Sequence, residues 1–355
     1  MAAPAMPHQG VVVPGVDPAD ATQILPPGAD RRVWRAMRRT GLGGSDISAL
    51  LGMSGYRAPI HLWEDKTGAI PLLDVPPSEA AEMGELLEPV VRDRFARVHG
   101  FEVRLAGMLR SSRWPWAFAN PDGWVDDGSG VLTGYEGKTC DKDLGPEWGT
   151  DRAPLVPDHA ELQAQWGMAV TGAHGWWVAA LIGGNRNVYR YLHRDEHLIA
   201  DLVSITGHWW RAHVLDGVEP EPDGSRAWTT YLRRKFAVAE PGSVVQLSAE
   251  DGAAIQRERR EALLAERHSK QGHESVKNRV RRLLGNAERL VGLGGQQIAT
   301  YKHTSRFRHK AFAEAEPDLY QQYLTTVEAT DVERLKRDHP DIYRAYCVRE
   351  LRFTD

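Results

Sequence analysis

The sequence predicts a mixed α/β fold, with a central mixed β-sheet flanked by helices, followed by a mainly helical C-terminal region. Helix-period and strand-period segments alternate between residues 31 and 222, which is the pattern of a layered α/β core. Beyond residue 248 the chain is dominated by charged, helix-favouring stretches. A chain of 355 residues, 42% hydrophobic and 26% charged, is long and apolar enough for one large core with an appendage.

Three parts of the chain follow from these patterns. Residues 1–30 are rich in Pro, Ala and Gly and contain no Lys or Arg, so we predict a mobile tail. Residues 31–222 form the predicted α/β core. Residues 223–355 comprise a linker-like passage to about residue 246 and then the mainly helical region.

The elements of the core are predicted from periodicity and from turn residues. The first helix, 84–99, has apolar residues at helical spacing and ends at Gly100. Strands, helices and a hairpin around Gly183-Gly184-Asn185 follow. In order, these are strands 102–109, 123–125 and 131–140, helix 158–170, strands 176–182 and 187–193, and helix 195–215.

The C-terminal part is predicted to begin with two helices separated by a glycine. The first covers 251–270 and stops at Gly272, and the second covers about 274–284. A short strand, 297–303, and further helix over 317–347 complete the prediction.

Composition excludes several classes of protein. Two cysteines are too few for a disulfide scaffold, a four-cysteine zinc module or a four-cysteine iron–sulfur site. No apolar run approaches the roughly 18 residues that a membrane span needs. The N-terminus lacks the charged start of a secretory signal. We therefore expect a protein without membrane association in the cytoplasm, which is the host cytoplasm if a phage encodes it.

The charge distribution favours a phosphate-binding surface despite a net charge of −4. Residues 31–39 hold five arginines and no acid, and residues 256–310 hold 14 Lys or Arg against 5 Glu. Local basic patches of this kind are typical of nucleic-acid contacts. The alternative is that they are solvated helix faces.

The residues that indicate chemistry are Asp122, Glu136 and Lys138. Strand side chains alternate, so Glu136 and Lys138 project from one face, and a hairpin would bring Asp122 beside Glu136. Two carboxylates there would bind Mg²⁺, with a metal-bound water as nucleophile. Lys138 would orient that water, help its deprotonation or offset charge on a phosphate. The alternative is a surface strand with a Glu–Lys pair.

The stretch from residue 41 to about residue 222 resembles the YqaJ-type viral recombinase family, which includes lambda-exonuclease-like nucleases of the PD-(D/E)xK superfamily. The resemblance rests on motifs in a fixed order over about 180 residues. They are Gly41-Leu42-Gly43-Gly44-Ser45-Asp46-Ile47, Leu50-Leu51-Gly52, Tyr56, Leu62-Trp63, Gly84-Glu85-Leu86-Leu87-Glu88-Pro89, Asn120-Pro121-Asp122, Glu136-Gly137-Lys138, Gln163-Ala164-Gln165, Val170-Thr171-Gly172, Arg194-Asp195-Glu196 and Trp209-Trp210.

The resemblance implies a restriction-endonuclease-like core and assigns roles to the motif residues. Asp122 and Glu136 are implied metal ligands, Lys138 the catalytic lysine and Glu88 a further acid at the metal. Gln163 is implied in the active site, with Gln165 as the reserve. A pocket for a 5′-phosphate would be lined by Arg38 or Arg39, Ser45 and Asn120. Asn120 stands where the family often has Ser, so this pocket departs from the family pattern.

The function implied is a Mg²⁺-dependent phage or prophage exonuclease, with Mn²⁺ as the alternative ion. It would hydrolyse the 5′ strand of linear duplex DNA and leave 3′ single strands for recombination. The implied partners are DNA ends and a single-strand annealing protein, and the implied assembly is a ring, a trimer by family analogy. Two alternatives remain: an endonuclease or defence nuclease with the same chemistry, and a catalytically silent DNA-binding protein.

Overall fold

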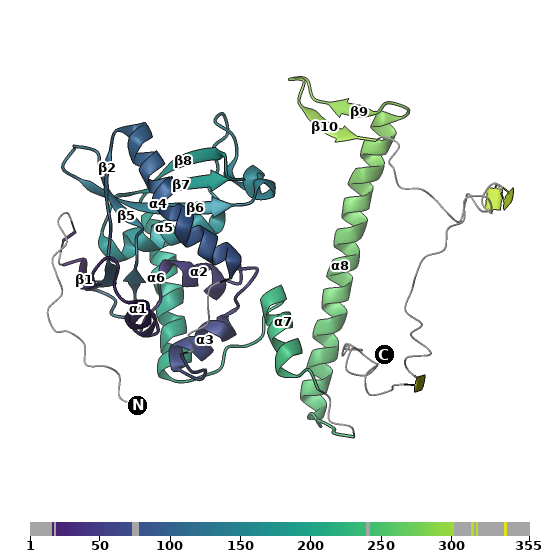
Figure 1. The fold of residues 1–355 in the computed structure, drawn as a ribbon. Coiled ribbons are helices and arrows are strands. Elements are labelled where there is room, and N and C mark those ends of the chain that lie inside the picture. Colours follow the sequence, from purple (N-terminus) through teal and green to yellow (C-terminus); the bar gives the residue numbers. More distant parts are fainter. Residues whose placement is uncertain are drawn as a thin grey trace. The chain divides into compact units, whose positions relative to one another are not determined.

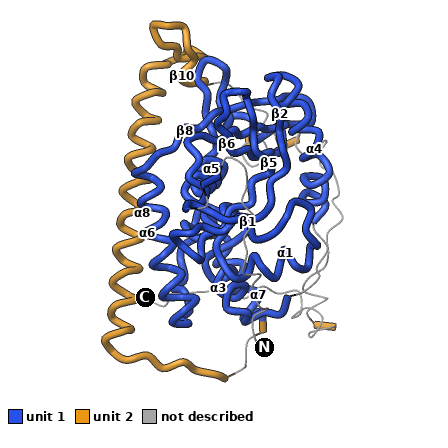
Figure 2. The backbone as a smooth tube through the Cα atoms, turned by 90° about the vertical axis from the view of Figure 1, so that its left-hand side faces the viewer, with its two compact units in different colours: residues 1–237 blue, residues 238–355 orange. Residues whose placement is uncertain are grey.

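The computed structural model describes residues 16–17, 19–72, 78–238 and 242–301, and the short pieces 314–315, 317–318 and 337–338. The chain divides into two compact units, residues 1–237 and residues 238–355 (Figure 2). The first unit is the predicted mixed α/β fold (Figure 1). No helix in the described part of the chain is both long and apolar enough to cross a lipid bilayer.

The centre of the first unit is a five-stranded mixed sheet with the order β2-β5-β6-β7-β8. Neighbouring strands are antiparallel except β6 and β7, which are parallel. This parallel pair needs a crossover, and helix α5 provides it. The strands are β2 (Glu102–Arg104), β5 (Gly123–Asp126), β6 (Leu132–Cys140), β7 (Gly175–Ile182) and β8 (Arg186–His193).

Helices cover both faces of this sheet. Helix α4 (Glu79–His99) packs on one face through Val91 and Phe95, which contact Tyr135 of β6. Helices α5 (Asp158–Thr171) and α6 (Glu196–Trp209) cover the other face, where the even-numbered side chains of β7 are buried. Because strand side chains alternate, the even-numbered residues of β6 also face α5.

A smaller sheet and three short helices lie beside this core. The sheet has the order β1-β3-β4, with β1 (Ala21–Leu25), β3 (Met108–Ser111) and β4 (Phe118–Ala119). The helices are α1 (Arg31–Arg38), α2 (Gly44–Leu50) and α3 (Pro59–Thr67). The remaining elements of this unit are a 3-10 helix η1 (Lys142–Trp148), a π-helical turn η2 (Trp210–Leu215) and α7 (Arg226–Lys235).

The structure differs from the sequence predictions in the N-terminal half. Residues 21–25 belong to the predicted tail, yet they form β1 and pair with β3. The predicted strand 102–109 is two strands in different sheets, because the chain passes close to β1 at Gly107, where a Cβ atom would lie 2.1 Å from the Leu25 carbonyl oxygen. The rest of the predicted tail, 1–15 and residue 18, lies outside the described residues.

Differences also occur towards the C-terminus. The predicted linker 223–246 contains α7, and the predicted helix 195–215 begins after the N-cap Asp195 and changes to π-helical winding at Trp210. Two predicted helices are one, α8 (Ala249–Leu284), which continues through Gly272. An interior glycine costs only about 1 kcal/mol and keeps its backbone hydrogen bonds, so it does not have to end a helix. The predicted helix 317–347 lies almost entirely outside the described residues.

The second unit contains α8 and a hairpin of β9 (Arg289–Val291) and β10 (Gln297–Thr300). The side chains of α8 are almost all exposed, and charged residues of both signs occupy it. Its stability therefore owes more to the Ser248 cap and to ion pairs such as Lys270–Glu266 than to a buried face.

Candidate active site

The site is built where the ends of β5 and β6 meet the first turns of α5. Asp122 immediately precedes β5, and its backbone N–H donates to the Tyr135 carbonyl oxygen at 3.0 Å. The next pair in the ladder is Gly123 and Tyr135, which places Asp122 level with Glu136 on the neighbouring strand. Glu136 and Lys138 both project towards α5. The predicted hairpin therefore brings the three residues together.

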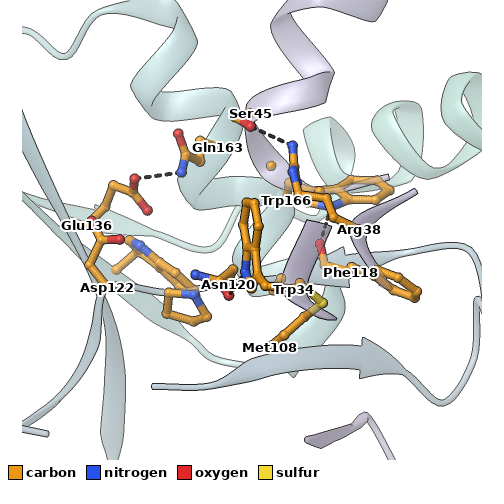
Figure 3. Close-up of a pocket in the computed structure, with 16 residues that line it drawn as sticks. Trp34, Arg38, Ser45, Met108, Phe118, Asn120, Asp122, Glu136, Gln163 and Trp166 are labelled. Carbon is orange, nitrogen blue, oxygen red and sulfur yellow. Dashed lines mark hydrogen bonds between the residues drawn. The ribbon is translucent and has the colours of Figure 1, made fainter. Parts of the chain in front are cut away.

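Glu136, Lys138 and Gln163 form a closed hydrogen-bonded triangle. Lys138 Nζ donates to Glu136 Oε1 at 2.6 Å and to Gln163 Oε1 at 2.8 Å. Gln163 Nε2 donates to the same Glu136 oxygen at 2.6 Å, as Figure 3 shows. Burial alone would lower the pKa of Lys138, but the carboxylates of Glu136 and Asp122 outweigh it and raise the pKa. Lys138 is therefore a fixed ammonium group at neutral pH.

Asp122 and Glu88 bring two further carboxylates to the same place. Asp122 Oδ2 accepts a hydrogen bond from the Gly137 N–H at 2.8 Å. Burial raises the pKa of Asp122 well above its ordinary value, and the charges of Glu136 and Glu88 raise it further. Burial also raises the pKa of Glu88, which lies on α4 and pairs with Arg92 at 3.5 Å. All three acids line a cavity of about 300 Å³ together with Lys138.

These carboxylates fit a hard divalent cation. Burial and then the charges of Glu136 and Glu88 raise the pKa of Asp122, and a bound cation would offset both effects. Carboxylate oxygens are the ligands that Mg²⁺ prefers, and Mg²⁺ keeps several waters. Within the described residues, no three His, Cys, Asp or Glu side chains converge into a complete ligand set. The protein would accordingly supply Asp122 and Glu136, and water or phosphate would supply the other ligands.

A second cavity, of about 170 Å³, extends from the carboxylates to Arg38. Glu136 and Asp122 line one end, and Arg38 and Ser45 line the other (Figure 3). Arg38 Nη2 donates to Ser45 Oγ at 2.7 Å, and the guanidinium lies over the ring of Trp34. The cavity therefore has an acidic end and a basic end.

Asn120 and Trp34 form the wall between the two ends. The Trp34 Nε1–H donates to Asn120 Oδ1 at 3.0 Å, which fixes the orientation of the amide. Asn120 lines the cavity beside Asp122. Its amide nitrogen has no acceptor among the described residues and could donate to an anion in this space.

Asp46 is a buried residue that positions Arg38, and the sequence analysis assigned it no role. Its fully buried carboxylate accepts hydrogen bonds from Arg38 at 2.8 Å and Arg57 at 3.2 Å, and pairs with Lys66 at 3.1 Å. Burial would raise the pKa of Asp46, but the charges of Arg38, Lys66 and Arg57 hold it well below the ordinary value. The signal available in the sequence was the acid in Gly43-Gly44-Ser45-Asp46, which follows Arg38 at a short distance.

Two glycines let these elements approach one another. A Cβ atom on Gly43 would lie 2.1 Å from Arg38 Nη1, and one on Gly44 would lie 2.7 Å from Gln163 Cγ. Larger residues would push Arg38 out of the cavity or separate α2 from α5. Close packing of α2 against Arg38 and α5 therefore accounts for glycine at positions 43 and 44.

Two predicted residues lie elsewhere. Arg39 points away from the cavity, where Nε donates to Asp65 at 2.9 Å and Nη2 to the Ile70 carbonyl at 3.0 Å. Gln165 is buried and joins β8 to α6, because it donates to the His193 carbonyl and accepts from the Asp195 N–H. For each predicted pair, Arg38 or Arg39 and Gln163 or Gln165, the first residue lines the site. The second is bonded to other parts of the fold.

Neutralising Asp122 should stabilise the protein in the absence of metal. The folded state raises the pKa of this acid, so its ionisation costs stability as pH rises above the unfolded value of 3.8. We expect Asp122→Asn to unfold at a temperature about 2 °C or more above wild type at pH 7 in EDTA. The difference should shrink at pH 4. A lower unfolding temperature for the variant than for wild type at pH 7 would contradict the conclusion that the ionised form of Asp122 destabilises the folded protein.

The candidate site lies within the part of the chain that matches a known protein family. The model of the YqaJ-like viral recombinase domain matches residues 33–174. The protein YqaJ of Bacillus subtilis strain 168 is 31% identical over 299 residues, covering 82% of this chain and 90% of that protein.

Two solved structures are also similar to parts of the chain. An alkaline exonuclease from Laribacter hongkongensis is 20% identical, with a TM-score of 0.42, covering 58% of this chain and 97% of that one. A phage related exonuclease from Haemophilus somnus 129PT is 11% identical, with a TM-score of 0.34, covering 52% and 100%. The range 33–174 includes the candidate site from Trp34 to Gln163.

Proposed function

The chain belongs to the YqaJ-like viral recombinase family, and from its site we propose that it is a metal-dependent DNA exonuclease. It would hydrolyse the 5′ strand of linear duplex DNA and leave 3′ single strands for recombination by strand annealing. The observation that carries the proposal is the single cavity with Arg38 at one end and Asp122 and Glu136 at the other. A terminal 5′-phosphate at Arg38 would direct the following phosphodiester towards the carboxylates.

The residues of the chain have separate tasks in this reaction. Arg38 is held by Asp46 and Ser45, so its guanidinium is already oriented for a phosphate. Gln163 and Lys138 both donate to Oε1 of Glu136 and so fix the position of its carboxylate. The Lys138 ammonium would also offset the negative charge that develops on the phosphate under attack.

The metal would be held by Asp122 and Glu136, with Glu88 in the adjoining cavity wall. When bound, Mg²⁺ or Mn²⁺ would supply charge stabilisation and an activated water at neutral pH. Lys138 is then a charged donor and not a base, because its neighbours keep it protonated.

The experiment compares linear duplexes carrying a 5′-phosphate or a 5′-hydroxyl with a covalently closed circle, in Mg²⁺ and in EDTA. We expect metal-dependent loss of linear DNA only, about tenfold faster with the 5′-phosphate because Arg38 binds it through charge-assisted hydrogen bonds. Arg38→Gln should remove that preference. Arg32→Gln is the matched control, because Arg32 is on the same helix and does not line the cavity.

Other outcomes would lead to the alternative functions. Cleavage of the closed circle would indicate an endonuclease, and DNA binding without hydrolysis in any divalent metal would indicate a silent binding protein. The proposal further includes the host cytoplasm as compartment, an annealing protein as partner and a ring, a trimer, as the assembly. Sedimentation with and without DNA tests the assembly.

A further inference from the structure

A third cavity, of about 430 Å³, lies between α3 and α7, away from the carboxylates. Helix α7 is fixed there by Ala227 and Trp228, which are buried against Ala58 and Ile60. The Tyr231 hydroxyl also donates to Glu64 on α3 at 2.8 Å. The walls of the cavity are therefore held in place by packing, and its shape does not depend on the polar residues at its mouth.

The cavity is lined by cationic and hydrogen-bonding groups. Arg226 and Arg234, from the two ends of α7, are exposed and have no ion-pair partner among the described residues. None of the described residues that line it is acidic, and the nearby Glu64 is already bound by Tyr231. Two arginines without ion-pair partners among the described residues, lining one cavity, are suited to binding a phosphate.

His61 adds a neutral donor to this wall. Its Nδ1 accepts a hydrogen bond from the Ala58 N–H at 3.0 Å, so the proton of the neutral ring is on Nε2. Burial lowers the pKa of His61 and, with the charges of Arg57 and Arg234, outweighs the hydrogen bond to Ala58 and the charge of Glu64, which raise it. The ring can therefore donate to an anion without carrying charge itself.

Tyr56 is the remaining lining residue with a distinctive position. Its side chain is 93% exposed, whereas most of the tryptophans of this unit are buried or half-buried. It belongs to one of the motifs singled out in the sequence, yet it has no contact with the active site described above. An exposed aromatic ring beside a cationic cavity is an arrangement that can stack on nucleic-acid bases.

We propose that the cavity between α3 and α7 binds a phosphate of single-stranded DNA, with Tyr56 stacked on the adjacent unpaired base. The choice of DNA rests on the proposed function. A chain of contacts also joins this cavity to the active site. Arg57, next to Tyr56, bonds Asp46, which holds Arg38 in the second cavity. The cavity would thus guide a strand that has separated from its complement near the site of hydrolysis.

The test measures binding of fluorescent DNA in EDTA, where no hydrolysis occurs, to a single-stranded oligonucleotide and to a blunt duplex. We expect Tyr56→Ala to weaken single-strand binding by about fivefold or more, while Tyr56→Phe keeps it. The double change Arg226→Gln with Arg234→Gln should also weaken it and reduce the salt dependence by about 0.7 per lost phosphate contact. The duplex should be affected much less.

Arg233→Gln is the matched control, because Arg233 is exposed on the same helix and does not line the cavity. Equal single-strand binding by all variants would overturn the inference, and an equal loss for both DNAs would overturn its single-strand assignment. Hydrolysis is measured separately. Normal hydrolysis with unchanged binding would refute this inference alone, and the expected binding pattern without hydrolysis would refute the proposed function alone.

Discussion

Replacing Lys138 with alanine is expected to lower the rate of DNA hydrolysis by about 10²- to 10³-fold, the loss found when one charge-stabilising donor is removed from an active site. Lys138 donates to both Glu136 and Gln163, so its loss removes a positive charge and one of the two hydrogen bonds to Glu136 Oε1. Binding of DNA in EDTA should change little, because the basic end of the cavity is formed by Arg38 and Ser45.

The measurement is the initial rate on linear duplex DNA at saturating Mg²⁺, with DNA affinity determined in parallel. Lys142→Ala is the control, since Lys142 is an exposed lysine at the start of η1, just after β6, and does not line the site. Thermal unfolding shows whether the variant remains folded. A rate for Lys138→Ala within threefold of wild type would exclude the assigned role.

The sequence was sufficient to predict that Asp122, Glu136 and Lys138 lie together, because their relative positions depend on local structure. Alternation along one strand decides the face of Glu136 and Lys138, and one hairpin decides the position of Asp122. The central helices and strands could be predicted for a similar reason, since their apolar periodicity reflects the two buried faces of the sheet.

The parts that escaped prediction depend on contacts distant in the sequence. Strand β1 has a five-residue sequence without strong alternation, and it exists because β3 offers an edge. Nothing local distinguishes Arg38 from Arg39. Their difference arises because Asp46 and Ser45 face the first and Asp65 the second. Such choices are made by tertiary packing, which residue types alone do not specify.

Helix α8 illustrates the opposite error, in which a local signal was given too much weight. Gly272 was expected to end a helix, but neighbouring residues such as Lys270 and Glu274 are good helix formers and the backbone bonds continue. The glycine penalty is small compared with the summed preference of 36 residues.

Replacing Asp46 with alanine is expected to destabilise the protein by about 3–5 kcal/mol, the cost of removing one partner from a buried ionic cluster. Lys66 would be affected most, because its side chain is 1% exposed and Asp65, at 3.5 Å, would be the remaining carboxylate beside it, with the Arg38 carbonyl oxygen at 2.9 Å as its other acceptor. Arg38 and Arg57 would lose the carboxylate that orients them. The 5′-phosphate preference should therefore fall together with stability, although Asp46 does not line the cavity.

The midpoint of urea unfolding at pH 7 measures the effect, with Asp65→Asn as the control. Asp65 is partly exposed, pairs with Arg39 at 2.9 Å and lies 3.5 Å from Lys66. Lys66 keeps its closer partner Asp46 in this variant, so the loss of Asp65 should cost about 1 kcal/mol. Asp46→Asn, which keeps the shape but not the charge, separates electrostatics from packing. An Asp46→Ala variant no less stable than Asp65→Asn would show that the cluster does not hold this region together.

The pH dependence gives a second, independent check on Asp46. Its folded pKa lies below the ordinary value of 3.8, so its contribution is fully present above that value and is lost as pH falls towards the folded pKa. Wild type should therefore lose stability between about pH 5 and pH 2 more steeply than Asp46→Asn. The same carboxylate positions Arg38. In Asp46→Asn, the extra loss of stability at low pH and the preference for a 5′-phosphate should therefore disappear together.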